Sequence, residues 1–100
     1  MSVETLEERL EAALPQLRSL NAAVKFDLGT DGSYVVDARS GQPSLSQAAD
    51  ADTDCTIRIS GDNLIKLLNG KLDPMLAYTM GKIKVSGSMG IAMKLVSALG

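Results

Sequence analysis

Residues 70–88 carry the most informative pattern in the chain, GKLDPMLAYTMGKIKVSGS. The pair Asp73-Pro74 is a typical helix start, because aspartate caps the first turn and proline suits the first helical position. Gly81 ends this short helix, since glycine readily adopts the left-handed conformation that follows a helix. Residues 82–86 then alternate polar with aliphatic side chains, which predicts a strand. The stretch therefore predicts a short helix that leads directly into a strand.

The residues on either side of this stretch predict a mixture of helices and strands. Leucines at three- and four-residue steps predict an amphipathic first helix that starts at Ser2 or Thr5 and ends near Pro15. Alternating patterns predict four strands in an antiparallel meander, at residues 24–28, 34–39, 44–48 and 56–59. Ser60 and Gly70 bracket another short helix, and Ser88 caps a last one. This order predicts an α+β fold.

The composition indicates one domain over residues 1–100. Hydrophobic residues make up 45% of the chain and aromatic residues only 3%, so the core should be aliphatic. We find no apolar run long enough to cross a bilayer and no secretion leader. Cys55 is the single cysteine, which excludes an internal disulfide and fits a reducing compartment. A cytoplasmic location is therefore expected.

Charge is divided unevenly along the chain, whose net charge is −2. Residues 1–54 hold ten acidic and four basic residues, whereas residues 55–100 hold two acidic and six basic ones. The overall acidity argues against nucleic acid as a partner. The basic, apolar second half suits an anionic amphiphile or an anionic membrane surface. Ordinary solvated lysines explain the pattern equally well.

Residues able to catalyse a reaction are scarce. The chain has no histidine, which removes the commonest general base and the commonest metal ligand. Cys55 therefore lacks a histidine partner and is interpreted as inert packing. Residues 50–61 begin like a calcium loop but have Cys55 where glycine belongs and Gly61 where glutamate belongs. We therefore expect no enzyme activity, no metal and no cofactor.

The segment 70–88 is similar to the recurring core of the sterol carrier protein 2 family. Phe26-Asp27-Leu28, Gly32-x-Tyr34 and Asp54 also fit that family, and the resemblance runs essentially end to end as a lone domain. Tyr34 stands where the family often has tryptophan. The resemblance implies a five-stranded, mainly antiparallel sheet covered on one face by helices, with a hydrophobic tunnel between them. It also implies non-enzymatic binding of a fatty acid, acyl-CoA, phospholipid or sterol.

Family tunnels are lined by the two short helices, the last helix and the inner face of the sheet. Carried over by position, the resemblance assigns the lining to Leu64, Leu67, Leu68, Leu72, Met75, Leu76, Met80, Ile83, Ile91, Met93, Leu95 and Val96. Charge clustering makes Lys71, Lys82 and Lys84 candidate contacts for a ligand head group. The expected partner is thus a small lipid or fatty acyl ligand, with transient membrane contact as a further candidate.

Two features of the second half leave alternatives open. Four methionines lie within the last 26 residues, and methionine adapts either to variable ligands or to irregular core gaps. The last helix has two apolar stripes, which is more than one sheet contact needs. Either this helix is sandwiched in the core, or its extra face meets a ligand, a membrane or a second subunit. The alternatives are an interaction or dimerisation module, and an accessory domain that delivers an apolar substrate to a separate enzyme.

Overall fold

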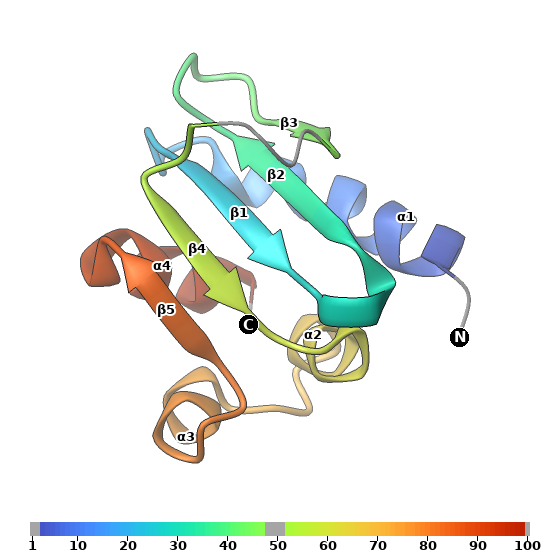
Figure 1. Ribbon diagram of the computed structural model, residues 1–100. Coiled ribbons are helices and arrows are strands. Elements are labelled where there is room, and N and C mark those ends of the chain that lie inside the picture. The colour runs from blue at the N-terminus through green and yellow to red at the C-terminus, as the bar shows by residue number, and fades with distance from the viewer. Residues whose placement is uncertain (1–2, 48–51, 100) are drawn as a thin grey trace.

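A computed structural model describes residues 3–47 and 52–99 and shows one twisted sheet with helices on one side (Figure 1). The strands lie in the order β3-β2-β1-β4-β5. Their bounds are β1 Ala23–Asp27, β2 Ser33–Asp37, β3 Ser44–Ser46, β4 Cys55–Arg58 and β5 Lys84–Gly87. The α-helices are α1 Val3–Ala13, α2 Gly61–Leu68, α3 Pro74–Thr79 and α4 Met89–Leu99, with short 3-10 turns η1 Leu14–Leu17 and η2 Gly29–Asp31. The expected α+β class with a five-stranded, mainly antiparallel sheet is confirmed.

The position of β4 differs from the expected meander. Strands β1, β2 and β3 do form antiparallel neighbours, but β4 pairs with the other side of β1 and runs parallel to it. Strand β5 then pairs antiparallel with β4. Cys55 and Ile57 are both buried, which a site beside the short, half-exposed β3 would not achieve. Burial of these two side chains thus favours pairing β4 with β1, near the centre of the sheet, over pairing it with β3, the strand that precedes it in the sequence.

The first helix ends where its proline predicts. α1 stops at Ala13, and Pro15 falls in the tighter turn η1 that follows. Proline has no N–H to continue the α-helical bonding pattern, so the chain proceeds as a 3-10 turn. α1 begins at Val3, so Thr5 is not its cap, and Ser2 lies outside the described residues.

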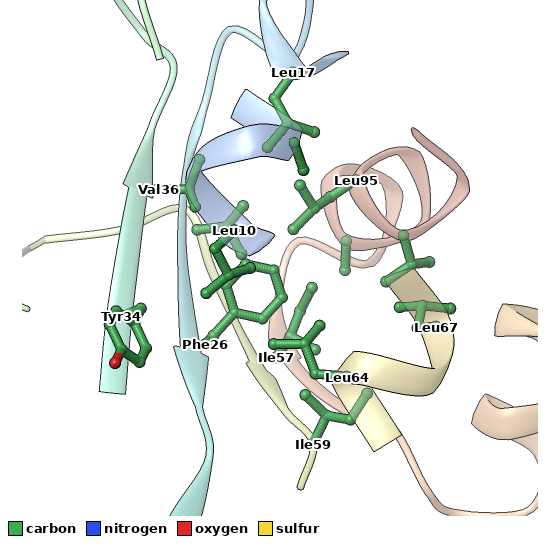
Figure 2. Packing of buried hydrophobic residues seen from close by; sticks show 14 of the residues in the cluster. Leu10, Leu17, Phe26, Tyr34, Val36, Ile57, Ile59, Leu64, Leu67 and Leu95 are labelled. Atoms are coloured by element: carbon green, nitrogen blue, oxygen red, sulfur yellow. The ribbon is translucent and has the colours of Figure 1, made fainter. Parts of the chain in front are cut away.

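The core lies between the covered face of the sheet and helices α1, α2 and α4 (Figures 1 and 2). Phe26 pairs with Tyr34 on one neighbour and with Ile57 on the other, so all three side chains share this face. All three are fully buried. Leu64 and Leu95 contribute from α2 and α4 to the same cluster. Lys25, Asp27 and Thr56 lie on the opposite face, as the period-two pattern predicts, but Val35 on that face is buried too.

Candidate functional site

Helix α2 is held at both ends by the residues that the sequence assigned to them. The Ser60 side chain accepts a hydrogen bond from the Asn63 N–H at 3.1 Å. At the other end, Gly70 has φ +72°, and the Lys71 N–H donates to the Lys66 carbonyl at 2.8 Å. This closing pattern is a Schellman motif, and it ends the helix. Leu64 and Leu67 on the inner face are fully buried, while Leu68 and the following Leu72 are partly buried.

Helix α4 covers the sheet beside α2. It begins after Ser88, whose hydroxyl accepts a hydrogen bond from the Ile91 N–H at 3.4 Å. Leu95 and Val96 are buried, while Ile91 and Met93 are partly buried against the same cluster. Ile83, just before β5, is buried as well. The structure therefore brings nine of the twelve residues assigned to the tunnel into one aliphatic group, which comprises Leu64, Leu67, Leu68, Leu72, Ile83, Ile91, Met93, Leu95 and Val96.

Helix α3 stands apart from that group. Asp73 caps it by accepting hydrogen bonds from the N–H groups of Met75 at 2.9 Å and Leu76 at 3.2 Å. Only Ala77 of this helix is buried. The other three residues assigned to the tunnel are exposed, with Met75 at 61%, Leu76 at 56% and Met80 at 59% of their surface. They stay predicted ligand contacts, but their side chains are exposed. They lie on α3 or at its C-cap, and Figure 1 shows this helix at the edge of the molecule.

The three candidate head-group lysines are all exposed, and two of them lie together. Lys82 and Lys84 line an open pocket of about 390 Å³ that also includes Arg58 and Asp27. The Arg58 guanidinium lies 3.5 Å from the Asp27 carboxylate. Lys71 lies instead in the connection between α2 and α3. The pocket thus brings together three cations and one anion at the ends of the parallel strands β1 and β4.

Sequence reasoning missed two groups. Arg58 ends a predicted strand and gave no sign that the fold would bring it close to the lysines of β5. Tyr34 is fully buried, and its hydroxyl has no hydrogen-bond partner among the described residues. Tyr34 belongs to the buried cluster, and Figure 2 shows its ring over β2, to one side of the other labelled side chains. A tyrosine on the inner face of an aliphatic core was the available signal, because a buried hydroxyl needs a partner.

Groups with reactive or metal-binding chemistry do not gather at this site. Within residues 3–47 and 52–99, no three or more His, Cys, Asp or Glu side chains are placed to hold a metal ion. The first aspartate of the calcium-like stretch, Asp50, lies outside the described residues. Cys55 is buried at the start of β4, and this burial, followed by the nearby Asp54 carboxylate, raises the pKa of its thiol. A raised pKa keeps the thiol protonated and unreactive at neutral pH.

Among the described helices, none has the length and apolarity needed to cross a bilayer.

The curated relatives include sterol carrier protein 2 itself and a dehydrogenase-like protein. Sterol carrier protein 2 of Gallus gallus is 42% identical over 67 residues, which is 67% of this chain and 12% of that protein. Hydroxysteroid dehydrogenase-like protein 2 of Bos taurus is 32% identical over 82 residues, or 79% of this chain and 20% of that protein. The chain therefore spans between about an eighth and a fifth of the length of these two relatives.

A solved structure and a family model cover almost the whole chain. The solution structure of palmitated SCP2L2 from Aedes aegypti is 25% identical, with a TM-score of 0.78 over 99% of this chain and 95% of that one. The model of the SCP-2 sterol transfer family matches residues 3–100. This chain belongs to the SCP-2 sterol transfer family.

Proposed function

We propose that this chain binds and carries a fatty acyl ligand without catalysing a reaction on it. The observation that carries the proposal is the match, along 99% of the chain, to a relative whose structure is described as palmitated. The aliphatic group beneath α2 and α4 supports it, since each buried ligand methylene gains about 0.8 kcal/mol. Acyl-CoA, phospholipid and sterol are the other ligands to compare in the same assay.

The proposed tunnel lies between the covered face of the sheet and helices α2 and α4, with α3 at its mouth. The nine clustered residues of the predicted lining support this location, because they belong to one apolar cluster or pack against it. The exposed Met75, Leu76 and Met80 would then meet the ligand as it enters. The lysines of the basic pocket favour an acyl ligand with an anionic head over a neutral sterol.

The hydroxyl of Tyr34 supports a ligand with a polar group. A buried hydroxyl without a partner costs about 1–3 kcal/mol, so the free protein gains when a ligand provides one. A carboxylic acid or a hydroxyl on the ligand meets that need. This assigns Tyr34 a role in binding that aliphatic packing alone does not explain.

The decisive experiment is native mass spectrometry of gently purified protein, followed by solvent extraction and displacement of a fluorescent fatty acid. We expect a bound lipid and a saturable displacement curve. Tyr34→Phe should weaken fatty acid binding by about three- to tenfold, which corresponds to one net hydrogen bond, without lowering the free energy of unfolding. Absence of both lipid and displacement would overturn the carrier function. A loss of stability in Tyr34→Phe with unchanged affinity would remove the tyrosine from the site.

The proposed setting is the cytoplasm, where such a carrier would exchange ligand with membrane surfaces. The free thiol of Cys55 supports a reducing compartment. Fusing the chain to a fluorescent protein and imaging it beside a cytoplasmic marker tests this setting.

A second candidate function is delivery of an apolar substrate to a separate enzyme. The match to one fifth of a dehydrogenase-like protein favours it, because this kind of domain occurs there beside a larger remainder. The test compares turnover of a purified candidate enzyme with free substrate and with substrate preloaded on this chain. Faster turnover from the preloaded form at equal total substrate would support delivery, and slower turnover would indicate mere sequestration.

A further inference from the structure

Most of the large apolar side chains that are exposed in the described part of the chain lie on or beside helix α3. Four of the five such residues, Met75, Leu76, Tyr78 and Met80, belong to this helix or its C-cap. The helix lies at one end of the molecule, below β5, with only Ala77 buried against the rest (Figure 1). Contiguous exposed apolar side chains on a small protein mark a surface that meets another apolar phase.

The basic pocket adjoins this helix directly. Gly81 follows the C-cap of α3 and itself lines the pocket that contains Arg58, Lys82 and Lys84. Asp27 is the one carboxylate among the lining residues, and it already pairs with Arg58. The two lysines are thus left to attract an anion from solution. An apolar protrusion and a cationic pocket therefore form one continuous surface, which we call the α3 surface.

We propose that the α3 surface docks the protein onto an anionic phospholipid bilayer, with the apolar side chains of α3 entering the interface and Lys82 and Lys84 contacting phosphate groups. Interfacial membrane binding combines these two ingredients, buried apolar area and attraction to anionic lipids. The inference rests on the proposed carrier function for its purpose, since a carrier must meet the membrane that supplies its ligand.

Charge favours a bilayer over a second copy of the chain as the occupant. A two-fold dimer on this surface would bring each α3 against its copy and crowd two basic pockets together. Like charges facing one another oppose such an interface. An anionic leaflet, in contrast, neutralises both pockets and accepts the apolar side chains.

The absence of tryptophan from the sequence allows a clean probe of this surface. Tyr78→Trp places one tryptophan on α3, and Gln42→Trp places one in the exposed loop between β2 and β3, at the other end of the molecule (Figure 1). Each variant is mixed with vesicles of phosphatidylcholine alone, or of equal parts phosphatidylcholine and phosphatidylglycerol. We expect a blue shift and quenching by brominated lipid only for the α3 probe, and only with the anionic vesicles.

Further substitutions in the Tyr78→Trp protein separate the contributions of charge and of apolar side chains to vesicle binding. Each lysine near an anionic leaflet strengthens binding about fivefold, so Lys82→Glu with Lys84→Glu should weaken it at least about 25-fold. Leu76→Ser should weaken it at least about tenfold. The control is Arg18→Glu, which reverses the charge of one side chain away from the α3 surface. Arg18 and Gln42 line a different pocket. Arg18→Glu should leave vesicle binding within about twofold, less than the effect of one lysine.

The possible outcomes are distinct. Equal shifts for both probes, or no shift for the α3 probe, overturn the docking surface. A blue shift of the α3 probe without vesicles, together with a dimer in sedimentation, overturns it in favour of a second copy. Fatty acid binding by the unmodified chain is measured separately in solution without vesicles. Fatty acid binding without docking overturns this inference alone, whereas docking without fatty acid binding overturns the carrier function.

Discussion

We expect Gly87→Ala to destabilise the fold by about 2–5 kcal/mol, because Gly87 meets two separate constraints at the end of β5. Its φ is +91°, which side chains of L-residues rarely adopt. A Cβ added there would stand 2.7 Å from the Asp54 carbonyl oxygen and 3.0 Å from the Cys55 Cα. Both neighbours are backbone atoms, so no flexible side chain can move aside.

The magnitude follows from adding these two effects. A non-glycine residue held at positive φ costs about 1–3 kcal/mol, and overpacking against fixed atoms costs a similar amount. The Asp54 carbonyl also accepts a hydrogen bond from the Ser88 N–H at 3.1 Å, just before α4 begins. A backbone shift that relieved the clash would therefore disturb the start of α4. The expected loss from Gly87→Ala is a large fraction of the total stability of a typical domain, which is about 5–15 kcal/mol.

Urea unfolding monitored by circular dichroism measures the effect, and Gly90→Ala supplies the control. Gly90 lies in the first turn of α4, has no positive φ, and has open space where a Cβ would stand. Alanine there should stabilise the protein by up to about 1 kcal/mol, since it is the better helix former. Equal and small effects of the two substitutions would refute the claim that the strand and helix meet too closely at Gly87 for a side chain.

Two further predictions concern neighbours of that junction. Asp54→Ala should cost about 1–2 kcal/mol in urea unfolding, because the Asp54 carboxylate accepts a hydrogen bond from the Ala23 N–H at 2.8 Å. Asp54→Asn keeps an acceptor and should cost less, so equal losses would contradict the role of this bond. The Cys55 thiol, whose pKa is raised by burial, should react with iodoacetamide more slowly in the folded than in the urea-unfolded protein. The free energy of unfolding of the unmodified protein, relative to that of Cys55→Ala, should fall as pH rises past about 8.5, because the thiol of the unfolded chain loses its proton first. If the free energies of unfolding of the two proteins change with pH in parallel, this prediction is wrong.

Local signals predicted the elements of the second half well. Ser60, Asp73 and Ser88 accept the expected capping hydrogen bonds, and Gly70 and Gly81 end their helices with positive φ. These signals succeed because capping and chain reversal depend on residues within one helical turn. The order of the strands was predicted less well, because the pairing of β4 with β1 depends on long-range burial that no local pattern contains.

The residues of the candidate site were also predicted only in part. The resemblance selected an apolar set, and nine of its members do form one group, since helices that cover a sheet must bury such side chains. Periodicity cannot distinguish an apolar residue facing the core from one facing solvent on a six-residue helix, so the exposure of Leu76 was not anticipated. Arg58 was missed for a related reason, since only the pairing of β4 with β5 places it opposite Lys84.

Helix α3 is exposed although local hydrogen bonds fix both of its ends. Asp73 caps the first turn, and after Gly81 the Lys82 N–H closes on the Ala77 carbonyl at 2.8 Å, so both ends of the helix are fixed by their own residues. Ile83 is buried directly afterwards, which anchors the chain to the edge of the sheet. Burying Leu76 or Met80 would gain about 1.5–3 kcal/mol each, and this fold forgoes that gain. The proposed docking of α3 onto a bilayer would recover part of this gain, because the same side chains would then leave water.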